Sequence, residues 1–328
     1  MRKPAVTIRA VALGLVLNAS AVAAAQDWPT RPITMVIPFA AGSGSDIAGR
    51  ILAPYMSELL GRPIIVENVG GAGGITAASR VARAAPDGYQ ILLGTAGTHA
   101  VNQTLYRKLP YNAATDFAPV ALTVEQPIAV IARTDLPVNG LRELVNYLKG
   151  NQARSQYGSP GAGTAPHLAC ALLNASIGVE ITHVPYRGAA PAMQDLMAGR
   201  IDYQCATFAP TIPQIEGKLV KGIALLSRMR SPVLPTLPTA HEQGLTDFEA
   251  TGWYAFFLPK GTPQTIVRKF NEVTDATMNM PIVRQRLREV GSELVAPERR
   301  SPEYLQEFVA SEIRKWAAAI KAAGVSLD

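Results

Sequence analysis

Short apolar runs alternate with segments of helical apolar spacing along most of the chain. The first such unit has an apolar run at residues 33–37, a loop of small residues at 38–46, and a segment from Ile47 to Leu60 with helical apolar spacing. Strands that alternate with helices in this way predict a parallel sheet with right-handed crossovers. Repeated along the chain, the pattern predicts strands at 63–67, 89–93, 180–186, 201–205, 224–227 and 253–259, and helices at 75–85, 141–148, 168–175, 189–197, 264–278, 281–290 and 302–323.

The N-terminal segment has the pattern of a secretory signal peptide. A basic start is followed by a nearly uninterrupted apolar stretch from Ala10 to Ala25 that ends in small residues and is too short to span a bilayer. We therefore predict a signal peptide at residues 1–25, a mature chain that begins at Gln26 or Asp27, and export of a soluble protein. Lipid anchoring is not expected, because no cysteine stands at this junction.

The length predicts two domains. About 300 residues remain after the signal peptide, which is more than one hydrophobic core usually supports. The apolar segment 117–131 is interrupted by prolines, and we interpret it as an extended crossing into the second domain.

Charge argues against nucleic-acid binding. The net charge of the whole chain is +6, and without the three basic residues of the signal peptide 28 basic and 25 acidic residues leave +3. This excess is small, and no basic run is interleaved with aromatic residues.

The two cysteines leave two possibilities open. In an oxidising compartment Cys170 and Cys205 either form a disulfide or are two small buried apolar residues, because the sequence does not give the distance between their Cα atoms. The four histidines are scattered without the spacing of metal ligands. We therefore predict neither a metal nor a cofactor.

Glycine-rich loops with hydroxyl groups follow three of the predicted strands, at residues 38–46, 68–74 and 94–99. Ligands of parallel sheets bind beyond the carboxyl ends of the strands. A helix N-terminus attracts anions, because its free N–H groups and the helix dipole point at one place. A fourth loop of this kind, at 157–167, precedes the helix at 168–175. We therefore predict a small-anion site built from loop 38–46 and a second half elsewhere in the chain.

Known catalytic and nucleotide-binding motifs are not completed. The third glycine of a dinucleotide fingerprint would fall at Ile47, and no loop has the phosphate-loop or nucleophile-elbow pattern. No base stands next to Ser43, Ser45 or Ser159 in the sequence. These observations favour a binding protein over an enzyme, with a serine hydrolase that uses Ser159 or Ser43 as the alternative.

Several of the polar residues in these loops also have a purely structural interpretation. Asp46 and Thr164 stand where helix-capping residues occur, and His167 lies in the first turn of its helix.

An ordered series of motifs resembles the Bug family, the periplasmic receptors of tripartite tricarboxylate transporters. The similarity runs from about Trp28 to the C-terminus. The motifs are Pro38-Phe39 with Gly42 and Asp46, Val66-Glu67-Asn68 with Gly71-Ala72-Gly73-Gly74, Pro86-Asp87-Gly88-Tyr89, Leu93-Gly94-Thr95, Ser159-Pro160-Gly161 with Gly163 and His167, Val184-Pro185-Tyr186-Arg187-Gly188, Pro238-Thr239 with Glu242 and Gly244, and Trp253-Tyr254 with Pro259, Gly261 and Pro263.

The resemblance implies a two-lobed, type II-like periplasmic binding protein fold that closes on its ligand. Each lobe would be a mostly parallel sheet flanked by helices, with residues 26–126 and 248–328 in lobe one and 127–247 in lobe two. A carboxylate would be held between the lobes by backbone amides, hydroxyl groups and water. The candidate ligand-binding residues are Phe39, Gly42, Ser43, Gly44, Ser45, Asp46, Thr95, Gly97, Thr98, Ser159, Ala162, Gly163, Thr164, His167 and Thr207.

The sequence departs from the family pattern at two places. The usual glycine pair of the first loop is Gly42-Ser43, and an acid often found after a second-lobe strand is replaced by Ala206-Thr207. The ammonium group of an amino acid would then lack a counter-charge, so we predict a carboxylate ligand without an ammonium group. The family implies a monomer that delivers this ligand to membrane transporter subunits or presents it to a sensor kinase ectodomain.

Overall fold

The computed structural model describes residues 28–246 and 248–322. The predicted signal peptide and its cleavage site therefore lie outside the described residues. Of the helices that are described, none combines the length and the apolar character that crossing a membrane requires.

The first lobe is built on three parallel strands. β1 (Ile33–Ile37) lies between β2 (Ile64–Asn68) and β3 (Gln90–Thr95). Four of the five β1 residues are buried, as expected for a strand covered on both faces. The helices of this lobe are α2 (Gly44–Leu60), α3 (Ile75–Ala82), α9 (Gln264–Asn279), α10 (Pro281–Glu289) and α11 (Pro302–Ala322).

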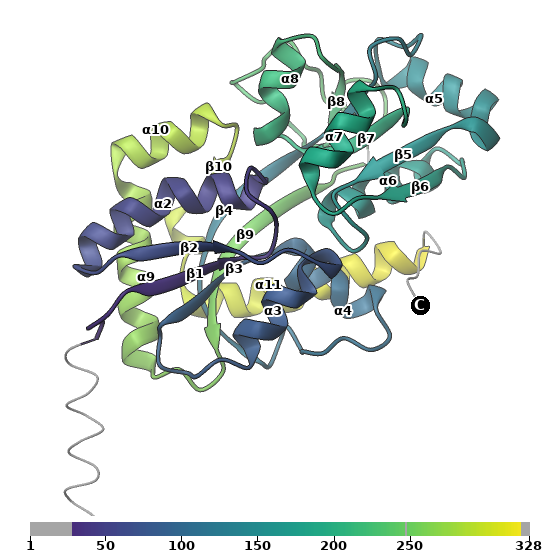
Figure 1. The fold of residues 1–328 in the computed structure, drawn as a ribbon. Helices are drawn as coiled ribbons and strands as arrows, with labels where there is room; N and C mark the ends of the chain where they lie inside the picture. Colours follow the sequence, from purple (N-terminus) through teal and green to yellow (C-terminus); the bar gives the residue numbers. More distant parts are fainter. Residues whose placement is uncertain (1–27, 247, 323–328) are drawn as a thin grey trace, which may run out of the picture.

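The second lobe repeats the arrangement on a smaller scale (Figure 1). Its strands are β5 (Gln156–Ser159), β6 (Thr182–Pro185), β7 (Tyr203–Thr207) and β8 (Lys221–Leu225), and its helices are α5 (Leu141–Asn151), α6 (Ala165–Ser176), α7 (Ala189–Met197) and α8 (Ile212–Glu216). β5 pairs in parallel with both β6 and β7. Short helical turns complete the structure at η1 (Ala72–Gly74), η3 (Gln152–Arg154), η4 (Ala209–Thr211) and η5 (Pro297–Arg299).

Two long strands, β4 (Phe117–Ala132) and β9 (Thr251–Pro259), run between the lobes (Figure 1). Residues 117–127 of β4 pair with β9, and residues 128–132 pair with β7 and β8. All of these pairs are antiparallel, so the sheet is mixed, with the order β2-β1-β3-β9-β4-β7-β5-β6. The short strand β10 (Glu293–Leu294) also pairs with β4.

The prolines of segment 117–131 do not interrupt the strand as the sequence suggested. Pro119 lies at a register shift in the pairing with β9, and Pro127 lies where the partner of β4 changes. Because proline cannot donate a hydrogen bond, these irregular positions are where a long strand tolerates it.

Residues 94–99 differ from the predicted loop. β3 continues to Thr95, and the helical turn η2 (Gly97–Val101) and helix α4 (Asn102–Leu105) follow. The Thr95 hydroxyl accepts a hydrogen bond from the Thr98 amide at 3.3 Å, and the Thr98 hydroxyl accepts one from the Thr95 amide at 2.9 Å. This reciprocal pair starts a helix, as a capping residue does.

The two cysteines form a disulfide. Cys170 of α6 and Cys205 of β7 are bonded, with 5.4 Å between their Cα atoms. Of the two possibilities that the sequence left open, the structure selects pairing, and the bond joins a helix to the strand beneath it within the second lobe.

Candidate functional site

The loop before α2 is held by hydrogen bonds within the first lobe. Ser43 is the N-cap, and its hydroxyl accepts from the Asp46 amide at 3.3 Å. Asp46 is therefore not the cap itself. Its buried carboxylate accepts from the Gly42 amide, Asn68 and Arg50, each at 2.9 Å. Asp46 thus fixes the loop and does not point a free carboxylate at a ligand.

The electrostatics of Asp46 fit this supporting role. Burial alone would raise the pKa of its carboxyl group. Hydrogen bonds from Arg50, the Gly42 amide and Asn68, together with the charge of Arg50, lower the pKa below its ordinary value. The carboxylate therefore stays ionised and keeps its partners.

A small cavity of about 50 Å³, here called the inner cavity, lies between the lobes. Seven of the predicted site residues line it, namely Phe39, Ser43, Gly44, Ser45, Thr95, Thr164 and Thr207. Nine further residues complete the lining: Ala96, Pro160, Ala165, Pro166, Gly188, Ala189, Gly252, Trp253 and Tyr254.

Three helix N-termini meet at the inner cavity. Gly44 and Ser45 begin α2, Ala165 begins α6, and Ala189 begins α7. Thr164 is the N-cap of α6, as the sequence suggested, and its hydroxyl accepts from the His167 amide at 3.3 Å. The described lining residues include no charged side chain. The cavity is therefore positive through its helix ends and suits a small anion.

The sequence missed the contribution of β9. A Cβ atom on Gly44 would lie 2.5 Å from the hydroxyl of Tyr254 and 3.2 Å from that of Thr207. Glycine at position 44 thus lets the first helix of one lobe approach β9 and the end of β7. The Trp253-Tyr254 motif carried a signal for this contact, but its aromatic residues also fit a purely structural role in the core.

The remaining predicted residues lie near the inner cavity without lining it. Gly42, Asp46 and Thr98 are bonded within the first lobe, and Gly97 faces Gly163 and Thr164 of the second lobe. Ser159 and His167 are buried and accept hydrogen bonds from the Gly161 and Gly163 amides, and Ala162 lines a neighbouring cavity.

Ser159 has a histidine partner that the sequence did not reveal. Its Oγ lies 2.8 Å from Nε2 of His183, and it accepts from the Gly161 amide at 3.2 Å. Ser159 is completely buried and does not line the inner cavity. The pair therefore braces the loop, and no substrate would reach this hydroxyl in the conformation observed.

Two stacked imidazoles complete this support. The ring centroids of His167 and His183 are 4.1 Å apart, and Nδ1 of His167 accepts from the Gly163 amide at 3.3 Å. Burial lowers the pKa of His167 to about 3 and that of His183 to about 4. The nearby His183 contributes to the shift of His167. Both rings are neutral near pH 7. The hydrogen bond from the Gly163 amide requires a neutral His167, because a protonated Nδ1 could not accept it.

A larger cavity of about 530 Å³, here called the outer cavity, adjoins the inner one and shares Phe39, Pro160 and Gly188 with it. Its other lining residues come from loop 70–74 of lobe one, from Ala40 and Tyr106, and from residues 161–162 and 185–187 of lobe two. The two cavities together follow the boundary between the lobes.

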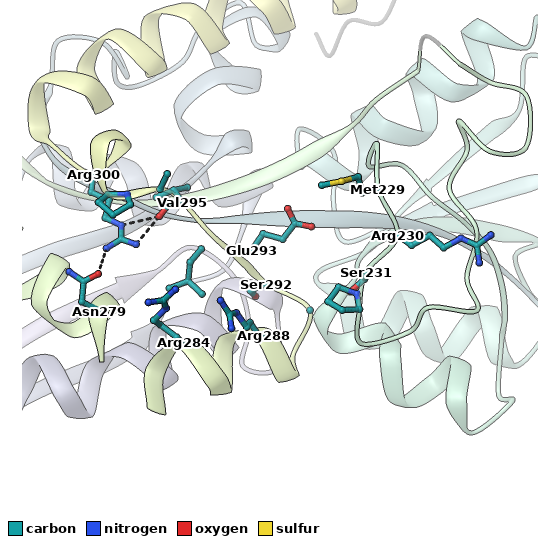
Figure 2. A pocket seen from close by; sticks show the side chains of 15 residues that line it. Met229, Arg230, Ser231, Asn279, Arg284, Arg288, Ser292, Glu293, Val295 and Arg300 are labelled. Atoms are coloured by element: carbon teal, nitrogen blue, oxygen red, sulfur yellow. Dashed lines mark hydrogen bonds between the residues drawn. The ribbon is translucent and has the colours of Figure 1, made fainter. Parts of the chain in front are cut away.

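A third cavity, of about 420 Å³, also lies between the lobes but contains none of the predicted site residues. Figure 2 shows Arg284, Arg288 and Glu293 on one side and Met229 and Ser231 on the other. In the described part of the chain, no group of three or more metal-ligating side chains occurs there or elsewhere. The convergence of helix ends makes the inner cavity the candidate site.

Comparison with known proteins gives a consistent result. Residues 48–325 match the family model described as tripartite tricarboxylate transporter family receptor. A UPF0065 protein in the TAR-I ttuE-ttuC' intergenic region of Agrobacterium vitis is 39% identical over 304 residues, which is 92% of this chain and 88% of that protein. Protein BugT of Bordetella pertussis is 29% identical and covers 96% of this chain, with 97% of its own length matched.

Solved structures agree with the sequence comparisons. The periplasmic binding protein BugD is 40% identical, with a TM-score of 0.87 over 91% of this chain and 99% of that one. MatC from Rhodopseudomonas palustris with bound malate is 38% identical, with a TM-score of 0.86 over 89% and 100% of the two chains. Rpa4515 of R. palustris with adipate is 35% identical, with a TM-score of 0.88 over 92% and 99%.

Proposed function

Because the chain belongs to the receptor family of the tripartite tricarboxylate transporters, we propose that it binds a small carboxylate in the inner cavity. The observation that carries this proposal is the meeting of three helix N-termini at a cavity whose described lining has hydroxyl groups but no charged side chain. Such a site offers several hydrogen-bond donors to one carboxylate without a fixed counter-charge.

The ligand of this proposal carries no ammonium group. An ammonium group needs acceptors of negative charge, and Thr207 occupies the end of β7 where an acid would provide one. The malate and adipate named with the related structures are likewise carboxylates without an ammonium group.

Lobe closure is part of the proposal. We place residues 26–126 and 248–328 in lobe one and residues 127–247 in lobe two. The pairing of β4 supports this division, because its partners change from β9 to β7 and β8 between Pro127 and Ile128. The lobes would close by bending at β4 and β9.

Membership in the receptor family supports a role in solute uptake. After export to the periplasm, the loaded receptor would deliver its ligand to membrane subunits of a tripartite tricarboxylate-type transporter. The buried position of Ser159 supports a binding role over hydrolysis, and we expect a Ser43→Ala, Ser159→Ala double variant to leave any background ester turnover unchanged.

A thermal-shift screen tests the function. The mature protein, refolded to remove carried-over ligand, is screened with the matched pairs succinate and aspartate, and glutarate and glutamate, together with malate, adipate and sugars. At about a hundred times its dissociation constant a ligand should add about 2.7 kcal/mol of stability. We expect stabilisation by carboxylates without an ammonium group. A folded protein that responds to no carboxylate would contradict the proposal, and tighter binding of the amino acids would contradict its second part.

A further inference from the structure

One charged side chain is found among the described residues that line the inner and outer cavities. The inner cavity has none, and the outer cavity has Arg187. Arg187 stands next to Gly188, which lines both cavities, so the arginine lies close to where the linings of the two cavities meet.

The backbone on either side of Arg187 is fixed to the loop that forms the inner cavity. The Tyr186 amide donates to the carbonyl oxygen of Ser159 at 3.0 Å, and the Gly188 amide donates to that of Pro160 at 2.9 Å. The Tyr186 hydroxyl also donates to Asp195 at 2.8 Å. The Cα atom of Arg187 is therefore held in place relative to any ligand of the inner cavity.

The side chain of Arg187, in contrast, is exposed. Among the described residues, none of the salt bridges involves it, and the nearby Asp195 is already paired with Arg200 at 2.6 Å. A guanidinium group on a fixed backbone, without a carboxylate partner and facing a cavity of about 530 Å³, is suited to bind an anion from that cavity.

We propose that Arg187 is a specificity-determining residue that binds the second carboxylate of a dicarboxylate ligand. This inference rests on the proposed function, since it needs the first carboxylate in the inner cavity. That cavity, at about 50 Å³, has room for little more than one such group. The rest of the ligand must then extend past Phe39 and Gly188 into the outer cavity, where its far end meets Arg187. The substrate class is an extended dicarboxylate.

The test compares six-carbon ligands that differ only in the group at the far end, which is a carboxylate, a neutral amide or a methyl group. Adipate, its monoamide and hexanoate are titrated calorimetrically into the mature wild-type protein and three variants. Arg187→Gln removes the positive charge, and Arg187→Lys keeps the charge but replaces the planar guanidinium group with an ammonium group. Arg142→Gln is the matched control, because Arg142 is an exposed arginine of α5 that lines neither cavity and its loss changes the net charge equally.

We expect Arg187→Gln to weaken adipate binding about tenfold, equivalent to about 1.4 kcal/mol. Hexanoate and the monoamide should bind the wild type and this variant equally, and Arg187→Lys should recover part of the affinity for adipate. Because the guanidinium is exposed, added salt should reduce the difference between wild type and Arg187→Gln.

Three results would overturn the inference. Equal affinity of wild type and Arg187→Gln for adipate would exclude a contact, and an equal loss for all three ligands would indicate an effect on the loop. An equal loss in Arg142→Gln would indicate only long-range attraction. In each of these cases, binding of hexanoate by the wild type would still support the proposed function as a carboxylate receptor. If the folded wild type bound none of the three ligands, this inference and the proposed function would both fail.

Discussion

The hydroxyl group of Tyr106 donates a hydrogen bond to the carbonyl oxygen of Ala162, 3.3 Å away, and this bond joins the two lobes across the outer cavity. Tyr106 directly follows α4 of the first lobe, and Ala162 belongs to the loop before α6 of the second. The bond requires contact between these two loops, so under the proposed lobe closure we expect it to stabilise the closed conformation.

A Tyr106→Phe substitution should therefore weaken carboxylate binding by about 1 kcal/mol, because one neutral hydrogen bond of the closed form is lost. Calorimetric titration checks the affinity. Tyr147→Phe on α5 is the control, since Tyr147 lies away from both cavities and should leave the affinity unchanged. Unchanged binding by Tyr106→Phe would show that the bond does not contribute to closure.

A substitution at Gly73 provides a second test of lobe closure. Its φ of 60° is in the left-handed region, and a Cβ atom there would collide with the Ala162 carbonyl oxygen of the other lobe. Gly73→Ala should lower ligand affinity more than tenfold (over ~1.4 kcal/mol) because the lobes can no longer meet. Gly61 has a φ of 67° with no atom near its Cβ position.

Gly61→Ala is therefore the matched control for backbone strain. Both variants should lose about 1 kcal/mol of folding stability, measured by urea unfolding, because alanine is disfavoured in the left-handed region. Only Gly73→Ala should lose ligand affinity. Similar affinities for the two variants would rule out closure at this contact.

The Asp46 carboxylate should contribute to the folding stability of the protein. Asp46→Ala removes the acceptor for Arg50, Asn68 and the Gly42 amide, and we expect a loss of about 2 kcal/mol of unfolding free energy, with weaker carboxylate binding. Glu67→Ala breaks the more exposed Glu67–Arg80 pair of the same lobe and should cost less than about 1 kcal/mol. Equal losses for the two variants, measured by urea unfolding, would contradict the bracing role of Asp46.

The lowered pKa values of the buried histidines predict that the folding stability depends on pH. Burial lowers the pKa of His99 and of His167 to about 3, and that of His183 to about 4. Below about pH 6.5 the unfolded state binds protons that the folded state does not, so stability is lost as the pH falls toward these values. Each histidine can contribute about 1.4 kcal/mol per pH unit in this range.

Urea unfolding at pH 7 and pH 5 measures this effect, and we expect a loss of several kcal/mol at the lower pH. His167→Asn should reduce the difference, because asparagine does not titrate and its amide oxygen can accept the Gly163 hydrogen bond in place of Nδ1. A stability that does not change between pH 7 and pH 5 would show that the imidazoles are hydrated in the folded protein.

Local patterns predicted most of the elements of the fold. The apolar periodicity placed β1 and α7 correctly, because strand and helix spacing are properties of neighbouring residues. The start of α2 was misplaced by three residues, since Ser43 and not Asp46 is the N-cap. The two threonines at 95 and 98 also carried a capping signal that the glycines around them obscured.

The lining of the site depends on pairing between distant segments, and local patterns do not contain it. β9 inserts between β3 and β4, which brings Tyr254 to Gly44. In the same way, the register of β5 with β6 brings His183 beside Tyr157, within reach of Ser159. The chemical character of the loops was predictable from the sequence, but their partners were not.

The sharing of β4 by both lobes limits how this protein can be divided. A cut near Pro127 would leave residues 117–127 of β4 and strand β3 in one fragment and their common partner β9 in the other. Each fragment would expose unpaired N–H and C=O groups along a buried, apolar edge, which is a template for association with other chains. Lobe one therefore does not correspond to one continuous piece of the chain, and chimeric receptors built from this scaffold should keep its two segments from the same parent.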